Sequence, residues 1–446
     1  MKILFSPLGD SDPIRGCYDG ACLHIIRHYH PVETVLFYTK EMEVKERCNH
    51  FYTYPIKKLA PDIEIEEIFS GIEQAHLYDN FVSILTEHII KIHEVNPEAE
   101  ILLNLSSGTP AIKTVMAIVS VEYDKWCRGI QVSSPMNGSN RNNEAATESP
   151  EDLWENNLDN EEGTENRCSE PKLQVIRNYA ERSRILSLLD KYEYATALSM
   201  MRNNTAFSAE AIKLTKFAEK RLKLKTDEAK KIFKKYAGVT LFPFDKQTKT
   251  EELIEYFLAM QIMQRQSRIS DLLLRMAPFL DKCLRYYVED NAAFHFNNFV
   301  EFKNSKTKRQ VLIKSKIKAN EPELARYLDR QYSSGFNDKT DIASQALSHI
   351  VNYMSEAKKY KDSTKHNAMC VEIAKIEKFS NSRNENAHEL KYTGEREFYE
   401  EVGLSSSEAV DTLSRMLCLI YGDMPNKMRN IYDELNGWIE GAVLNG

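Results

Sequence analysis

Short apolar segments alternate with amphipathic segments over the first 133 residues, and this alternation constrains the fold more than any other feature of the chain. The apolar segments have the length and composition of buried strands. They are residues 2–6, 32–38, 63–69, 100–105 and 129–133. Helical spacing fills the intervals, most clearly from about residue 73 to 95 and after Pro110. Strands that alternate with helices predict a mostly parallel α/β sheet with helices on both faces.

Two polar loops follow strands of this sheet, at the edge where such sheets bind ligands. One follows the first strand, and the other follows a later strand and opens a helix with Pro110 in its first position. Hydroxyl groups, a glycine that allows close backbone approach and a helix N-terminus suit a phosphate group. The candidate ligand-binding residues are Gly9, Asp10, Ser11, Asp12, Asn104, Ser106, Ser107, Gly108, Thr109 and Lys113.

Neither loop carries an established nucleotide-binding motif. The chain contains no G-x-x-x-x-G-K-[ST] sequence and no G-x-G-x-x-G sequence. An ordinary capped turn between a strand and a helix is therefore the alternative interpretation of residues 106–109. The residues alone leave the phosphate cradle and the simple turn equally open.

An acidic segment, residues 136–170, interrupts the pattern. Between Asn143 and Pro171 lie ten acidic residues and a single basic one, Arg167, which gives a local charge of −9. The chain as a whole has a charge of −7, so the remainder carries +2 and does not exclude a nucleic-acid partner. With almost no apolar residues, the segment is expected to be a mobile insertion or linker. Binding of the acidic segment to an Arg-rich partner is the alternative.

After Pro171 the helical period dominates to the end of the chain. The sequence therefore predicts an α/β plus all-α protein with four parts: 1–135, an α/β domain; 136–170, the acidic segment; 171–250, a helical connector; and 251–446, a helical domain. The eight cysteines are scattered and support neither a zinc site nor a disulfide framework. No apolar run reaches the ~18 residues of a membrane span, so a cytoplasmic protein is expected.

Two stretches of the helical part are strongly basic. Residues 213–236 keep helical apolar spacing, so a solvated helix face is the first interpretation and an RNA-facing surface the second. Residues 303–318 hold seven basic side chains and no acidic one. Because a phosphate chain is attracted by fixed positive charge, residues 303–318 are the preferred RNA-steering patch.

A short polar motif near residue 383 carries the candidate chemistry. Ser382 and Glu385 form a capping box that predicts a helix starting at Arg383. Asn384 and His388 are four residues apart and would then share a face. A guanidinium group, an amide and an imidazole beside a helix N-terminus suit phosphodiester chemistry. The alternative is that these polar side chains are simply solvated.

The Arg383-Asn384-Glu385-Asn386-Ala387-His388 sequence resembles the R-N-x-x-x-H motif of HEPN ribonucleases, which cut RNA without a metal ion. The N-terminal part resembles a CARF domain, a sensor of cyclic oligoadenylates, in its polar glycine loop after the first strand and its Ser-Gly-Thr element at a later helix. In their order, the sensor, the connector and the motif-bearing bundle are similar to the type III CRISPR-associated CARF–HEPN ribonucleases, specifically the accessory family of type III-A systems. This resemblance covers nearly the whole chain.

The resemblance implies a cyclic tetra- or hexaadenylate activator, a homodimer in which two copies of the motif meet, and single-stranded RNA as substrate. It also implies cleavage through the 2′-hydroxyl of the substrate, leaving a 2′,3′-cyclic phosphate and a 5′-hydroxyl. His388 would act as general base or acid, Arg383 would neutralise charge on the phosphate, and Asn384 would orient the phosphate or the imidazole. No metal, no cofactor and no stable association with the CRISPR effector complex are expected.

Two rival functions remain open from the sequence. One is a nucleotide-gated regulator that binds RNA without cleaving it. The other is a toxin-like HEPN ribonuclease outside CRISPR defence. The ring size of the activator, the cleavage preference and any degradation of the activator by the sensor domain also remain open.

Overall fold

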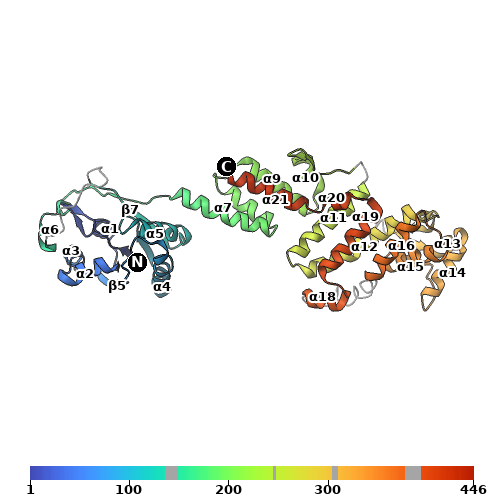
Figure 1. The fold of residues 1–446 in the computed structure, drawn as a ribbon, viewed down its shortest axis with the longest axis horizontal. Helices are drawn as coiled ribbons and strands as arrows, with labels where there is room; N and C mark the ends of the chain where they lie inside the picture. Colours follow the sequence, from blue (N-terminus) through green and yellow to red (C-terminus); the bar gives the residue numbers. More distant parts are fainter. Residues whose placement is uncertain (136–148, 245–247, 304–309, 377–392, 446) are drawn as a thin grey trace. The chain divides into compact units, whose positions relative to one another are not determined.

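The computed structural model of the protein describes residues 1–135, 149–244, 248–303, 310–376 and 393–445. These residues form two compact units, Met1–Ala180 and Glu181–Gly446, and the boundary lies within helix α7 (Gln174–Asp190) (Figure 1). The predicted α/β plus all-α class is confirmed, while the four-part division of the chain stays a prediction. Among the helices in the described residues, none is long and apolar enough to cross a membrane.

The first unit contains a six-stranded sheet with the strand order β5-β4-β1-β6-β7-β8. Its strands are β1 (Lys2–Pro7), β4 (Glu33–Tyr38), β5 (Glu64–Phe69), β6 (Glu100–Asn104), β7 (Cys127–Val132) and β8 (Cys168–Ser169). The first five are parallel, as the sequence predicts, and only the short β8 runs antiparallel to its neighbour. The register pairs Phe5 with Val35 on one side and with Leu103 on the other. The carboxyl ends of β1 and β6 therefore lie side by side.

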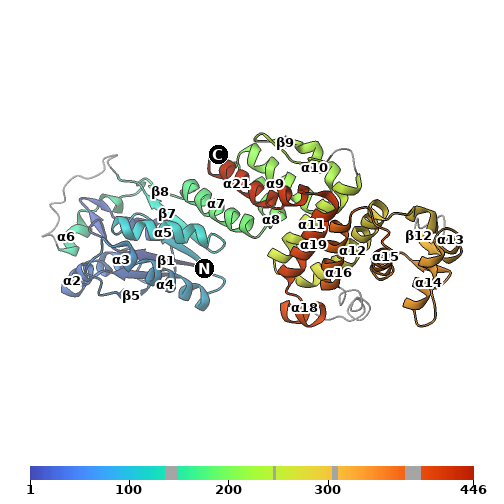
Figure 2. The ribbon, with the colours of Figure 1, turned by 45° about the vertical axis from the view of Figure 1, so that its right-hand side comes forward.

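Helices cover both faces of this sheet (Figures 1 and 2). One face packs against α4 (Val82–Val95) and α5 (Pro110–Glu122). The other face packs against α1 (Ala21–Tyr29), α2 (Lys40–Asn49), α3 (Thr53–Leu59) and α6 (Pro150–Glu155). Leu4 and Phe5 follow each other in β1 and enter opposite cores, as the two-residue period of a strand requires.

Helix α4 begins later than predicted. The apolar spacing predicts a helix from about residue 73, whereas α4 begins at Val82 and follows a short 3₁₀ turn, η1 (Tyr78–Asn80). The Asn80 side-chain amide donates to the carbonyl of Gln74 and closes an irregular turn there. Asp and Asn side chains compete in this way with helical hydrogen bonds.

Much of the acidic segment is ordered. It forms α6, the 3₁₀ turn η3 (Leu158–Asn160) and strand β8, while residues 136–148 lie outside the described residues. Leu153 is 1% exposed, and Asn157 and Asp159 are each 4% exposed. The prediction of a mobile segment is therefore wrong for residues 149–169. The reason is that hydrogen bonds, ion pairs, a short strand and the burial of Leu153 in the core order the segment.

The second unit is mainly helical and has one continuous apolar core. Its buried residues extend from Ile185 to Val443. The principal helices are α8 (Tyr194–Arg202), α9 (Ala209–Leu222), α11 (Thr248–Arg265), α12 (Ile269–Asn291), α15 (Ser344–Glu356), α16 (Ser363–Ile376), α19 (Ser406–Tyr421) and α21 (Ile431–Leu444). Helix α9 packs on α21, which joins the helices on either side of residue 250. The apolar core of this unit therefore continues across residue 250.

A small antiparallel sheet, which the sequence did not predict, lies in the second unit beside α13 (Lys314–Asn320) (Figure 2). It consists of β11 (Val300–Phe302), β12 (Gln310–Ile313) and β13 (Lys339–Asp341). The apolar run in β12 is three residues long, too short for periodicity to distinguish strand from helix.

Three of the four cations of the 303–318 patch that the structure describes have acidic partners. Lys303 lies 3.6 Å from Asp341, and Lys316 lies 3.0 Å from Glu301. Lys314 pairs with Asp329. Residues 304–309, which include Lys306, Lys308 and Arg309, lie outside the described residues. The described part of the patch is therefore less electropositive than its sequence suggests.

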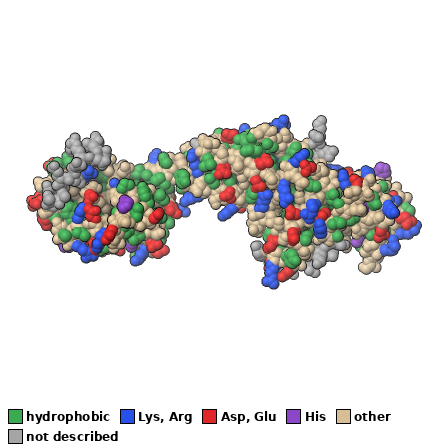
Figure 3. Space-filling view, in the orientation of Figure 1, with side chains coloured by type: hydrophobic (Ala, Val, Ile, Leu, Met, Phe, Trp, Pro, Cys, Tyr) green, Lys and Arg blue, Asp and Glu red, His purple; other side chains and the backbone are tan. Residues whose placement is uncertain are grey.

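The basic stretch 213–236 is largely structural. Arg221 is completely buried, and its Nε and Nη2 atoms donate to the two carboxylate oxygens of Glu255 at 2.8 and 2.6 Å. Lys220 pairs with Glu228 and Lys230 with Glu251. Figure 3 shows basic and acidic side chains interspersed on the face it draws. These pairs favour the interpretation of a packed and solvated helix face over an RNA-facing surface.

Candidate functional site

The two predicted glycine loops touch at the carboxyl edge of the sheet. A Cβ atom placed on Gly9 would lie 2.8 Å from the backbone nitrogen of Gly108. Gly108 has a φ of +86°, a left-handed conformation that glycine adopts at little cost. The close approach therefore requires glycine at both positions, and it brings residues 9–12 and 106–109 into one site.

The Asp12 carboxylate holds both loops to helix α1. It is 1% exposed and accepts hydrogen bonds from the backbone amides of Gly9 (3.2 Å) and Cys22 (3.0 Å). The Ser107 hydroxyl also hydrogen-bonds to it. Burial raises the pKa of Asp12 above its usual value, and these hydrogen bonds and the nearby Lys113 charge oppose that shift. Asp12 thus braces the loops and does not present its carboxylate to solvent.

Asn104 braces the second loop from inside the sheet. Its side-chain amide donates to the hydroxyls of Ser6 (2.9 Å) and Ser107 (2.8 Å). Its Oδ1 atom accepts from the Ser106 backbone amide at 2.9 Å. The Ser106 hydroxyl in turn accepts from the Val132 amide at 2.8 Å, which connects the loop to the end of β7. Asn104 and Ser107 are buried, so they shape the site from below.

The remaining predicted residues reach the surface to different degrees. Asp10 is exposed and pairs with Lys45 at 2.6 Å. The Thr109 hydroxyl caps α5 by accepting from the Ile112 amide, and it donates to the Ala75 carbonyl at 2.5 Å. Ser11 and Lys113 are half-buried, and Lys113 lies in the first turn of α5. An anion at this edge would meet the α5 N-terminus and the Lys113 ammonium group.

The predicted cleavage motif lies outside the described residues. This applies to Arg383, Asn384 and His388, and to the predicted capping pair Ser382 and Glu385. The structure therefore leaves their geometry a prediction.

Both flanks of the motif are anchored within the second unit. Upstream, Glu372 in α16 is 8% exposed and accepts from Nε of Arg415 in α19 at 3.0 Å. Downstream, the Thr393 amide donates to the Ser270 hydroxyl at 3.0 Å, and this hydroxyl donates to the Thr393 carbonyl at 3.1 Å. The described chain on either side of the motif is therefore fixed. Upstream, α16 is bonded to α19, and downstream, Thr393 is bonded to α12.

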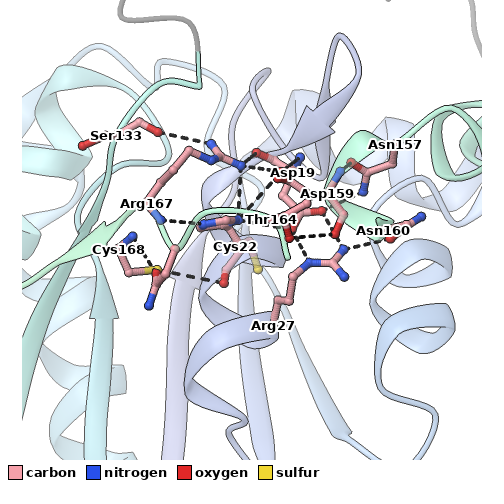
Figure 4. Close-up of polar contacts among 12 residues, drawn as sticks. Asp19, Cys22, Arg27, Ser133, Asn157, Asp159, Asn160, Thr164, Arg167 and Cys168 are labelled. Carbon is pink, nitrogen blue, oxygen red and sulfur yellow. Dashed lines mark hydrogen bonds and ion pairs between the residues drawn. The ribbon is translucent and has the colours of Figure 1, made fainter. Parts of the chain in front are cut away.

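The acidic segment contributes a buried charge network that sequence reasoning missed (Figure 4). Figure 4 shows Arg167 reaching toward Asp19 and Asp159 from the acidic segment, and Arg27 approaching from α1. The network comprises Asp19, His24, Arg27, Asn157, Asp159, Asn160 and Arg167. Its two halves are about 140 residues apart in sequence, so no local spacing signals it.

Asp19 is the most heavily bonded member of this network. Arg27 donates to it through Nε at 2.7 Å and Nη2 at 3.0 Å, and Asn157 donates through its amide at 2.7 Å. Burial alone would raise the pKa of Asp19, but hydrogen bonds from His24, Arg27 and Asn157 lower it to about 2. Asp19 is therefore a carboxylate at neutral pH.

Asp19, His24 and Asp159 are the one group of metal-ligand type among the described residues, with candidate ligand atoms within 4.8 Å of one another. The donor set does not suit a cation. Nε2 of His24 accepts from the Arg167 backbone amide at 3.0 Å, and Nδ1 faces Asp19 at 3.3 Å. Two guanidinium groups already occupy the carboxylates. We interpret the group as an ion-pair network and not as a metal centre.

Two family models match this chain in succession. The Cas_Csm6 CARF domain model matches residues 62–168, and the Cas_Csm6 HEPN domain model matches residues 241–440. The first match contains the Ser106–Thr109 loop and residues 149–168 of the acidic segment. The second contains the Arg383–His388 motif.

Curated relatives with the name CRISPR system endoribonuclease Csm6 resemble most of the chain. The protein from Enterococcus italicus is 26% identical over 402 residues, which is 87% of this chain and 88% of the relative. The one from Mycobacterium tuberculosis is 29% identical over 286 residues, 64% of this chain and 67% of the relative. A Streptococcus thermophilus relative is 30% identical over 279 residues, 62% of this chain and 63% of the relative.

A solved structure shares the fold. Enterococcus italicus Csm6 bound to cyclic hexa-2′-fluoro-hexa-dAMP aligns over 99% of this chain and 100% of that chain, with a TM-score of 0.58 and 23% sequence identity. At this identity the likeness supports the fold and its domain order.

The Gly9–Gly108 contact can be tested by adding one methyl group. We expect Gly9→Ala to lower the free energy of unfolding by about 1–3 kcal/mol, because the new Cβ meets backbone atoms that cannot rotate away. Asp10→Ala is the matched control in the same loop, since an exposed ion pair contributes about 0–1 kcal/mol. Urea unfolding of both variants measures the difference. Equal stability of Gly9→Ala and the wild type would show that the loops are not in close contact.

Proposed function

Since the chain belongs to the family of type III CRISPR-associated CARF–HEPN ribonucleases, we propose that it cleaves RNA at the Arg383–His388 motif under the control of a nucleotide bound by its sheet unit. The chain is an endoribonuclease of type III CRISPR defence. The residues of its sites and the identity of its activator are the proposed part.

The meeting of the two glycine loops carries the proposal for the sensor. Residues 9–12 and 106–109 converge at the carboxyl edge of a parallel sheet, where α5 offers its N-terminus and Lys113 its charge. A ring of phosphodiesters presents repeated negative charge, which suits such an edge. We propose cyclic tetra- or hexaadenylate as the activator, and the Enterococcus italicus relative bound to a cyclic hexanucleotide analogue supports that class of ligand.

The proposed cleavage uses the substrate's own 2′-hydroxyl. His388 removes the proton as the 2′-oxygen attacks the adjacent phosphorus, and the 5′-oxygen of the next nucleotide leaves and gains a proton. Arg383 neutralises the charge that develops on the phosphate, and Asn384 orients the phosphate or the imidazole. The products are a 2′,3′-cyclic phosphate and a 5′-hydroxyl. No step calls on a metal ion.

We further propose that the protein acts as a homodimer in which two copies of the motif meet. Each chain then contributes its motif histidine, so two histidines lie at the centre of the dimer. One can serve as base and the other as acid. Single-stranded RNA is the proposed substrate because its 2′-oxygen can rotate into line with the leaving group. The rival functions, an RNA-binding regulator without chemistry and a toxin-like ribonuclease outside CRISPR, predict no cleavage and no adenylate response respectively.

Removing the proposed catalytic side chains tests the cleavage site. We expect His388→Ala and Arg383→Ala to lower the RNA cleavage rate by about 10²–10⁴-fold, the usual value of a general acid–base group, without loss of the folded state. His295→Ala, an exposed histidine of the same unit, is the control and should cleave like the wild type. Rates come from labelled RNA, and circular dichroism checks folding. Near wild-type cleavage by either motif variant would refute the assignment.

Metal removal tests the mechanism separately. Because the proposed chemistry uses only an imidazole, a guanidinium and an amide, we expect cleavage to continue at nearly the same rate in excess EDTA. The measurement compares initial rates with EDTA and with added Mg²⁺ or Mn²⁺. A strict requirement for either ion would contradict this mechanism.

Loss of the Lys113 charge tests the sensor. We expect Lys113→Ala to raise the activator concentration for half-maximal cleavage about ten- to a hundredfold, because one charge-assisted hydrogen bond is lost. Thr109→Ala is a poorer test, since it also removes the α5 cap, worth about 1 kcal/mol of stability.

Two further variants complete the Lys113 experiment. Lys113→Arg keeps the charge and should recover part of the response. Lys91→Ala removes an exposed lysine on α4 and should respond like the wild type. If Lys113→Ala and Lys91→Ala respond alike, the activator does not contact Lys113.

A further inference from the structure

The ordered part of the acidic segment, residues 149–169, is hydrogen-bonded to two elements next to the proposed activator site. We refer to these residues as the strap. The Leu158 amide donates to the Cys17 carbonyl at 2.9 Å, and Asp159 accepts from the Asp19 amide at 2.7 Å. Both contacts hold the hairpin formed by β2 (Ile14–Arg15) and β3 (Tyr18–Asp19). Asn160 accepts from Arg27 at 2.9 Å and so also ties the strap to α1.

The hairpin that the strap holds lies in close contact with the first ligand loop, residues 9–12. A Cβ atom on Gly20, the residue after Asp19, would lie 2.2 Å from the Ser11 carbonyl oxygen and 2.9 Å from Cα of Asp12. The Gly20 amide donates to the Pro13 carbonyl at 2.7 Å. A displacement of Asp19 is therefore passed directly to the backbone of Ser11 and Asp12.

The same strap also reaches the second ligand loop. Strand β8 pairs with the end of β7, where Val132 is opposite Cys168. The Ser133 amide donates to the Arg167 carbonyl at 3.0 Å, and Arg167 returns a bond from Nη1 to the Ser133 carbonyl at 3.2 Å. Val132 holds the Ser106 hydroxyl. Val132 alone thus separates the strap from the second loop, and Asp19 and Gly20 separate it from the first.

The network within the strap has balanced charge. The carboxylates of Asp19 and Asp159 face the guanidinium groups of Arg27 and Arg167, and all four groups are at least four-fifths buried. Removing one member leaves a buried charge without its partner, which such a site tolerates poorly. The strap is therefore held in one position, and it can transmit that position to both loops.

We propose that the strap is a positioning element for the activator site, which it keeps in its binding geometry without touching the ligand. The proposal rests on the proposed function of residues 9–12 and 106–109. Asp159 and Arg167 are its positioning residues, because they join the strap to Asp19 and to Ser133. When the contacts of the strap are lost, the loops stay folded but become mobile. Part of the binding free energy of the activator is then spent on ordering them.

Asp159→Asn tests this proposal in the 446-residue chain. We expect backbone amides of residues 9–20 and 104–109 to exchange hydrogen at least tenfold faster without ligand. We also expect the Kd for the better-bound of cyclic tetra- and hexaadenylate to rise at least tenfold, while saturating activator restores the wild-type cleavage rate. Glu162→Gln removes one charge from an exposed position of the same strap and should match the wild type in all three measurements. Asn157→Ala, which removes one bond to Asp19, replaces Asp159→Asn if that variant does not fold.

Three results would overturn the proposal. They are unchanged exchange in both loops, faster exchange confined to residues 149–169, and an unchanged Kd despite faster exchange in the loops. If the wild type binds neither cyclic adenylate, the proposed activator fails, and the exchange of the two loops in the ligand-free protein still decides whether the strap positions them.

Discussion

The buried carboxylate of Asp12 is the interaction on which the candidate sensor site depends. It joins the Gly9 loop, the Ser107 loop and the first turn of α1 through two backbone amides and one hydroxyl. Burying a polar group is unfavourable unless its hydrogen-bonding capacity is filled, so the surrounding backbone is held where it can fill it. The Gly9–Gly108 contact brings the same two loops together.

Further hydrogen bonds and ion pairs of buried polar groups hold the parts of the sheet unit around Asp12. Asn104 fixes the second loop from the sheet, and the strap fixes the hairpin that follows the first loop. These groups supply little apolar area, yet they order a segment whose composition is that of a solvated linker. The helical unit uses the same means at the flanks of its motif, where Glu372 meets Arg415 and Ser270 meets Thr393.

The sequence predicts the parts of this protein that depend on local patterns. The strand and helix alternation, the two glycine loops and the helix opened by Pro110 all follow from neighbouring residues. It does not reveal that Asp12 and Asn104 point inward, because spacing does not show the direction of a side chain. Nor does it show that Asp159 meets Asp19, since the two are 140 residues apart. Residues 383–388 lie outside the described residues, so the motif still rests on resemblance.

Control of the helical unit's cleavage by a ligand on the sheet unit is the centre of the proposed function. The most direct measurement titrates the wild-type protein with cyclic tetra- and hexaadenylate and follows the rate of RNA cleavage together with ligand binding. We expect a saturable rise in rate with one of the two rings, with a midpoint that matches the Kd of that ring. A cleavage rate that is independent of both rings, at concentrations where one of them is bound, would contradict it.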